Sequence, residues 1–272
     1  MPVDLPPRVT ASPLIGDLAV WGLSWAGDRR AQAGLLDRLT GRWTTWPPNA
    51  VHHDESSYTI DLPGLGELLA PLDGWSGALL PAIRDVLSQT WLSQVRLPLM
   101  RALAEWGPTA APAVPEVTEL LRAGVRLGAA TALGAIGPDA APVTDHLRDL
   151  LRHDGEGPGE QPLQDDERVE VAWALWRITG DERDAVRVLT RVVAPLAEGR
   201  ALAVMRTATR YLAGIGPPAA EAIPVLRAAL ALDRWLAQHG GWRAFDEDRR
   251  QRDLARNALR RIAPPGTRPP RG

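Results

Sequence analysis

Hydrophobic positions along the chain recur three and four residues apart, which is the spacing of one face of an α-helix. Ala129, Leu133 and Ile136 form one such stripe, and Leu147 and Leu151 belong to the next one. Between them lie a glycine, which favours the left-handed conformation that ends many helices, and prolines, which cannot occupy a helix interior without breaking it. The glycine recurs at the same point of four segments: Gly107, Gly137, Gly180 and Gly216. The pattern predicts pairs of helices folded into hairpins.

The hairpin pattern is repeated along the chain. Four segments align without gaps: 68–87, 102–121, 132–151 and 211–230. Segments 21–40 and 174–193 align with small shifts, and 258–266 supplies a final half-unit. One leucine, called here the anchor, occupies the same position in every unit: Leu23, Leu69, Leu103, Leu133, Leu175, Leu212 and Leu259. Successive anchors lie 30 to 47 residues apart, which is typical of helical-hairpin repeats.

Stacking is the arrangement that such hairpins favour, because neither helix of a pair can bury its apolar face alone. We therefore predict an all-α fold, a right-handed α-solenoid of about seven hairpins that forms one domain over residues 1–272. Polar, proline-rich and acidic stretches interrupt the repeat at 40–64 and 153–167, where we expect loops. We expect 233–250 to cap the C-terminal end and 264–272 to be a disordered tail.

The repeat resembles a known family. ALGAIGPDAAPVTDHLRDLL and ALWRITGDERDAVRVL are similar to the HEAT-like repeats first named from phycobilisome lyases and found widely in bacterial HEAT-repeat proteins. The resemblance covers residues 66–231 most strongly. It implies the solenoid fold, whereas proteins of this kind serve as adaptors, scaffolds and enzyme subunits alike, so the fold alone does not assign a function.

Composition narrows the possible functions. Ala, Leu and 11 Trp dominate the apolar residues, with only 2 Tyr and 1 Phe, which favours helices over strands. The absence of Cys excludes disulfides and thiolate chemistry, and all 31 basic residues are Arg, which excludes a phosphate-loop or Schiff-base lysine. A net charge of −2 argues against a generally basic nucleic-acid binder. Neither a membrane-spanning run nor a signal-peptide pattern is present, so we expect a cytoplasmic protein without membrane contact.

Catalytic and metal-binding motifs are weak. His52, His53, Asp54 and Glu55 form the only cluster of metal-ligand type, and adjacent side chains of an extended segment point apart. No nucleophile elbow or glycine-rich phosphate loop occurs. The acidic run 165–167 precedes a predicted helix, where it would complement the helix dipole. We predict no catalytic residues, no metal and no cofactor.

Arginine placement follows the repeat. An Arg lies seven residues before the anchor in four units: Arg96, Arg126, Arg168 and Arg252. We expect this structural ladder to bridge carboxylates or helix-end carbonyls of neighbouring repeats, with a ligand-binding stripe as the alternative. A second set lies on the exposed side of the anchor helices, where a concave wall would place partner-binding residues: Arg101, Trp173, Arg177, Arg206 and Arg210.

Three functions fit these observations. The first is a non-catalytic scaffold or adaptor, monomeric or weakly dimeric, that binds a protein partner on its concave face. The alternative is a DNA-binding protein related to the HEAT-like alkylpurine DNA glycosylases, which use Trp, Arg and a catalytic Asp. The chain has the Trp and Arg, but its anchor helices hold no Asp at a matching position. The third, suggested by the name of the repeat, is attachment or removal of a tetrapyrrole.

Overall fold

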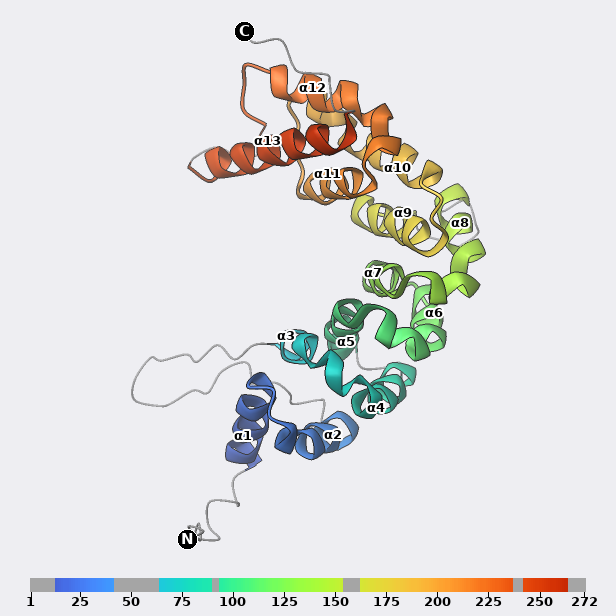
Figure 1. The fold of residues 1–272 in the computed structure, drawn as a ribbon, viewed down its shortest axis with the longest axis vertical. Coiled ribbons are helices and arrows are strands. Elements are labelled where there is room, and N and C mark those ends of the chain that lie inside the picture. Colours follow the sequence, from blue (N-terminus) through green and yellow to red (C-terminus); the bar gives the residue numbers. More distant parts are fainter. Residues whose placement is uncertain (1–12, 42–63, 90–92, 154–161, 237–241, 264–272) are drawn as a thin grey trace. The chain divides into compact units, whose positions relative to one another are not determined.

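The computed structural model describes residues 13–41, 64–89, 93–153, 162–236 and 242–263 (Figure 1). All regular structure in these ranges is helical and they contain no strand, which confirms the predicted all-α class. Nearly all of the expected loop 40–64, most of 153–167 and the expected tail 264–272 lie outside the described residues. The helices fall into two compact units that divide at Ala140.

The first unit contains two layers of helices. Its α-helices are α1 (Pro13–Trp25), α2 (Gln32–Gly41), α3 (Leu65–Leu69), α4 (Ser76–Ser88), α5 (Ser93–Trp106), α6 (Val114–Arg122) and α7 (Arg126–Ile136). The anchor helices α3, α5 and α7 pack side by side in sequence order. The second helices of the hairpins, α2, α4 and α6, contact one another in the same order. Each hairpin therefore packs on the next through equivalent faces.

The second unit repeats this arrangement. Its α-helices are α8 (Thr144–His153), α9 (Asp165–Thr179), α10 (Arg183–Val193), α11 (Ala203–Ile215), α12 (Ile223–Ala231) and α13 (Trp242–Ile262). The anchor helices α9, α11 and α13 lie side by side, α8 packs on α9, and α10 contacts both α9 and α11. Figure 1 shows α9 and α11 as neighbours.

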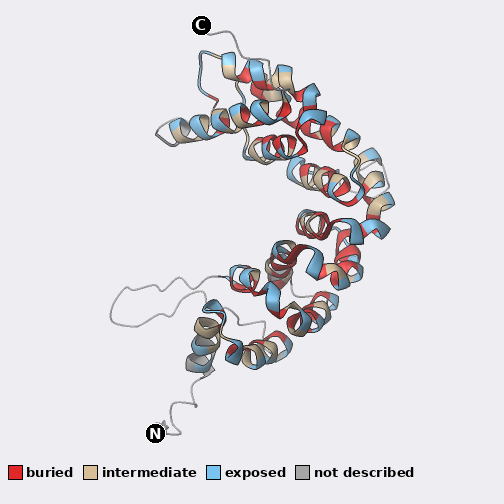
Figure 2. Cartoon of the chain, in the orientation of Figure 1, coloured by how far each residue is buried: buried red, intermediate tan, exposed pale blue. Residues whose placement is uncertain are grey.

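The apolar stripes form the core of both units. Five of the predicted anchors are buried: Leu69, Leu103, Leu133, Leu175 and Leu212. Leu23 and Leu259, in the end units, are half-buried. Buried positions alternate with exposed ones around each helix (Figure 2), because one face meets neighbouring helices and the other meets water.

The predicted glycines end their helices, but the prolines act differently from the expectation. Gly137 and Gly216 have φ angles of +81° and +77°, a backbone conformation that a side chain would strain. Instead of passing directly into the next α-helix, the chain continues through short 3₁₀ helices at Gly107–Ala113, Gly137–Val143 and Pro217–Ala222. Proline is tolerated there because the first residues of a helix need no backbone donor.

Two predicted interruptions differ in extent from the structure. Helix α9 begins at Asp165, so the last three residues of the stretch 153–167 belong to its first turn. In 233–250, the residues from Trp242 onwards form the start of α13, and the capping role expected for this stretch stays a prediction. The exposed rings of Trp235 and Phe245 meet edge to face, with 5.7 Å between centroids. A helix of this length is favoured because its buried side continues as far as Ile262 against α11 and α12.

Polar contacts connect successive hairpins. In the first unit the Trp106 indole N–H donates to the Leu69 carbonyl at 2.9 Å, joining α5 to α3. The Arg84 guanidinium donates to both carboxylate oxygens of Glu116 at 2.8–3.1 Å, joining α4 to α6. Since hydrogen bonds are directional whereas apolar packing is not, these contacts fix the register of one hairpin on the next.

The same turn occurs once in each unit. Gly27 and Gly180, both with positive φ, precede an aspartate that accepts from the backbone N–H and the guanidinium of the arginine two residues later. In the first unit the pair is Asp28 with Arg30, and in the second it is Asp181 with Arg183. The hydrogen bond from the arginine side chain is the main reason that the pKa of each aspartate falls from 3.8 to about 2.

We expect the Asp28 and Asp181 carboxyl groups to titrate near pH 2 in carbon-13 NMR spectra. Because the pKa is lower in the folded state, each turn stabilises the fold above about pH 4 and loses this contribution as the pH falls towards 2. Arg30→Gln and Arg183→Gln should each raise the pKa of the neighbouring aspartate towards 3.8, while Arg187→Gln leaves both unchanged. An unchanged pKa after removal of its own arginine would contradict the assignment.

Candidate partner-binding surface

Helix α9 carries two of the predicted partner-binding residues, and hydrogen bonds define both of its ends. Its first turn holds Asp165, Asp166 and Glu167, as predicted for the N-terminal end of a helix dipole. Glu167 Oε2 also accepts from the Gln164 backbone N–H at 3.0 Å. The helix ends at Gly180, whose N–H donates to the Trp176 carbonyl at 2.8 Å. These contacts mark where α9 begins and ends.

An aromatic pair joins α9 to α11. The rings of Trp173 and Tyr211 stack with 5.0 Å between centroids and 16° between planes. The Tyr211 hydroxyl donates to the Glu170 carboxylate, 2.9 Å from both oxygens. Glu170 and Trp173 are three residues apart on α9 and therefore share a face. The Tyr211 ring also packs against the apolar core of the second unit, so the pair is held on two sides.

Burial raises the pKa of the Tyr211 phenol above its ordinary value, and the neighbouring Glu170 carboxylate raises it further. Arg210 opposes this shift without cancelling it. The phenol therefore remains protonated at neutral pH and continues to donate to Glu170. A hydrogen bond to a charged acceptor contributes about 1.5–3 kcal/mol, which makes this contact the main polar link between α9 and α11.

Three arginines lie on the two helices that hold the aromatic pair: Arg177 on α9, and Arg206 and Arg210 on α11. The Arg177 guanidinium carbon lies over the Trp173 ring, 6.0 Å from its centroid, at the limit of a cation–π contact. Arg206 and Arg210 lie one turn apart on α11, and Arg210 donates to the Thr207 hydroxyl at 3.2 Å. Arg177 and Arg210 are exposed, and Arg206 is half-buried. The surface formed by Glu170, Trp173, Arg177, Arg206, Arg210 and Tyr211 is called the α9–α11 surface below.

The three arginines of this surface have no described carboxylate partner. Within the described residues, Arg177, Arg206 and Arg210 form no ion pair with a carboxylate, whereas many arginines do: Arg30, Arg84, Arg122, Arg148, Arg183, Arg187, Arg200, Arg252 and Arg256. Several of those pairs join residues three apart on a helix, where an acidic residue is supplied locally. The α9–α11 surface has no such local partner for its cations.

The structure places the predicted partner-binding residues in two groups. Trp173, Arg177, Arg206 and Arg210 come from neighbouring helices of the second unit. Arg101 is exposed on α5 of the first unit. It occupies the same position relative to its anchor as Trp173 and Arg210, two residues before it. The assignment of these five residues to partner binding stays a prediction.

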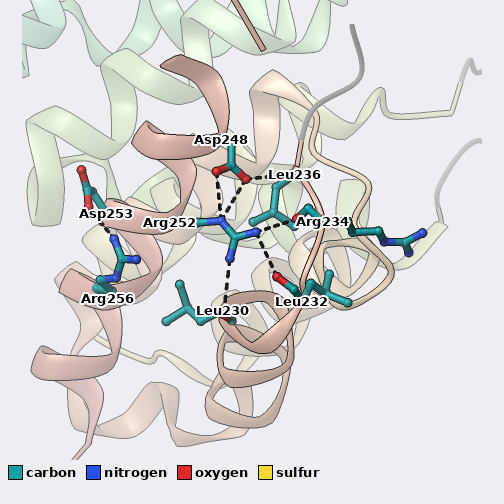
Figure 3. Close-up of polar contacts among 8 residues, drawn as sticks. All are labelled: Leu230, Leu232, Arg234, Leu236, Asp248, Arg252, Asp253 and Arg256. Carbon is teal, nitrogen blue, oxygen red and sulfur yellow. Dashed lines mark hydrogen bonds and ion pairs between the residues drawn. The ribbon is translucent and has the colours of Figure 1, made fainter. Parts of the chain in front are cut away.

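The predicted arginine ladder has varied surroundings. Arg252 on α13 is its best-connected member (Figure 3). It donates to both Asp248 carboxylate oxygens at 2.9 and 3.0 Å, and to the carbonyls of Leu230, Leu232 and Arg234 at 2.6–3.3 Å. Asp248 also accepts from the Leu236 N–H at 2.7 Å. Arg252 therefore fastens α13 to the end of α12 and the chain that follows it.

The other three ladder residues do not share this pattern. Arg168 donates to the Leu163 carbonyl, in the turn before its own helix, at 3.1 Å. Arg126 is the first residue of α7 and is half-buried. The Nε of Arg96 on α5 is buried and has no hydrogen-bond partner among the described residues. A common role for the four arginines stays a prediction.

Two residues of the α9–α11 surface were not identified from the sequence. Tyr211 precedes its anchor by one residue and Glu170 precedes its anchor by five, so neither shares a repeat position with the predicted set. The scarcity of tyrosine could have drawn attention to Tyr211, one of only two in the chain. Their contact joins residues 41 positions apart, and only the packing of α9 against α11 creates it.

The described residues offer little for other chemistry. They contain no group of three or more His, Asp or Glu side chains placed to hold a metal ion, and the His52–Glu55 cluster lies outside them. No described helix is both long and apolar enough to cross a membrane. Comparison of the chain with models of protein families, with characterised proteins and with solved structures gave no match.

Proposed function

We propose that this protein is a non-catalytic scaffold or adaptor, built as an α-solenoid of about seven HEAT-like hairpins, that binds a protein partner through its anchor helices. The observation that carries the proposal is the α9–α11 surface, which combines a fixed Trp–Tyr pair with three arginines, two exposed and one half-buried, that have no described carboxylate partner. Arg, Trp and Tyr are the residues most enriched at interface hot spots.

The repeated packing supports the solenoid. In each unit, anchor helices pack on anchor helices; among the second helices, α2, α4 and α6 contact one another in order in the first unit, and α10 contacts α12 in the second. Hairpins that stack in this way extend the structure in one direction and present a row of equivalent helix faces. Arg101 on α5, Trp173 on α9 and Arg210 on α11 each lie two positions before the anchor of their own helix.

The geometry favours a protein partner over nucleic acid. Nucleic-acid binders neutralise many phosphates, commonly about 6–10, whereas the α9–α11 surface offers three guanidiniums beside the Glu170 carboxylate. On the arginine-rich α13, Arg252 is engaged by Asp248 and carbonyl groups, and Arg256 by Asp253. In an electrophoretic mobility assay we expect no retention of duplex DNA at physiological salt.

Affinity purification from the native host tests the proposal. We expect a specific partner to be recovered by the wild-type chain and lost with Arg177→Glu combined with Arg210→Glu, because both charges reverse on the proposed surface. A matched control, Arg187→Glu with Arg227→Glu, makes the same charge change at exposed positions of α10 and α12 and should retain the partner. Circular dichroism verifies that both variants keep their helix content. Recovery of the same partner by both double variants would refute this surface.

A further inference from the structure

We propose that the α9–α11 surface recognises an acidic segment of the partner, with carboxylates bound by Arg177, Arg206 and Arg210 and an adjoining apolar side chain resting against Trp173. The proposal rests on the function proposed above and specifies the chemistry of the partner. Its basis is a local excess of positive charge that the protein itself leaves uncompensated.

Helix α11 shows this excess most clearly. It carries Arg206 and Arg210 four residues apart and contains no acidic residue. Two like charges at this spacing repel each other and destabilise the helix. Arg177 likewise lacks an acidic residue three or four positions before it on α9, and Asp181, four positions after it, is engaged by Arg183. Carboxylates from a partner would relieve the repulsion between the arginines and accept hydrogen bonds from their guanidinium N–H groups.

The surface is already ordered for binding. Trp173 is held by its stack with Tyr211, and Tyr211 is held by Glu170 and by the core. The Thr207 hydroxyl orients the Arg210 guanidinium. Side chains that are fixed before binding lose less conformational entropy when a partner docks. A guanidinium presents a planar fork of donors that matches the two oxygens of a carboxylate.

The amount of charge fits a short acidic segment. Three guanidiniums beside the single Glu170 carboxylate leave a net charge of two on the surface. This matches one or two carboxylates and is too small for a nucleic-acid backbone, whose binding relies on many phosphate contacts. The Tyr211 hydroxyl donates to both oxygens of the Glu170 carboxylate.

Peptide selection tests this chemistry directly. A phage library of random dodecapeptides is selected on the full-length wild-type chain after depletion on the Arg177→Glu, Arg210→Glu variant. We expect the surviving peptides to be enriched in Asp and Glu relative to the starting library. One selected peptide, labelled with fluorescein, should lose about tenfold or more in affinity when its acidic residues become Gln. It should lose a similar factor on Arg177→Gln with Arg210→Gln, and stay within about twofold on Arg187→Gln with Arg227→Gln.

The outcomes separate the two proposals. Surface-dependent peptides without acidic enrichment would overturn the acidic-segment proposal and leave the docking surface intact. A library that yields no surface-dependent peptide would also overturn it, and the affinity purification described above would then decide the scaffold function independently. Tighter binding of a fluorescein-labelled oligonucleotide of equal charge, with the same dependence on Arg177 and Arg210, would assign the surface to nucleic acid instead.

Discussion

Replacing Trp106 with alanine is expected to lower the free energy of unfolding of the first unit by about 3–5 kcal/mol. The Trp106 side chain is only 3% exposed, and its removal leaves a large cavity at the end of α5. The substitution also removes the buried hydrogen bond from the Trp106 indole N–H to the Leu69 carbonyl oxygen, which is 2.9 Å long. An unsatisfied buried acceptor adds about 1–3 kcal/mol to such a cost.

Two further variants separate these contributions. Trp106→Phe keeps much of the ring but removes the N–H donor. We expect it to lower the free energy of unfolding by more than about 1 kcal/mol, but by less than Trp106→Ala does. Trp25→Ala is the matched surface control, because Trp25 is 53% exposed and stacks only on Trp21 among the described aromatic rings. Urea unfolding followed by circular dichroism measures all three. A Trp106→Ala change no larger than that of Trp25→Ala would show that this contact does not join α3 to α5.

In the second unit, Arg252→Ala should lower the free energy of unfolding by about 3 kcal/mol. The Arg252 and Asp248 side chains are only 15% and 18% exposed, so water replaces the lost partner poorly. The substitution leaves the Asp248 carboxylate with the Leu236 N–H alone as its described donor. It also frees three backbone carbonyls, that of Leu230 at the end of α12 and those of Leu232 and Arg234 after it (Figure 3). Amide hydrogen exchange should rise in α12 and α13 before it rises in α9.

Arg256→Ala provides the control on the same helix. Arg256 and Asp253 are 57% and 60% exposed, and an exposed pair three residues apart contributes at most about 0.5 kcal/mol. Arg252→Lys should fall between the two, because lysine keeps the charge but cannot reach four acceptors with a planar fork. If Arg252→Ala and Arg256→Ala unfold at the same urea concentration, Arg252 does not fasten α13 to α12.

Local sequence features predicted much of the fold. Stripes spaced by three and four residues located the helices, and the anchors Leu69, Leu103, Leu133, Leu175 and Leu212 are buried as expected. The glycines at helix ends were predicted because only glycine adopts positive φ without strain. The 3₁₀ helices after Gly107 and Gly137 were not predicted, since a proline near a helix start permits either helix type.

The candidate site was predicted only in part. Trp173 and Arg177 share a helix face by their spacing, and Arg206 and Arg210 do so on α11, so the repeat pattern was enough to group them. Glu170 and Tyr211 could not be found this way, because their hydrogen bond joins separate helices. Similarly, four arginines share one repeat position, but their acceptors differ from Arg168 to Arg252.

The sequence by itself determined the helical class, the positions of the hairpins and the buried anchors, because these depend on the spacing of neighbouring residues along one chain segment. Only the tertiary structure decided which polar groups meet: Trp106 with Leu69, Tyr211 with Glu170, and Arg252 with the carbonyls after α12. Apolar contact tolerates many small shifts of one helix on another, whereas a hydrogen bond requires a particular donor and acceptor within about 3 Å, and that distance is set by the packed hairpins.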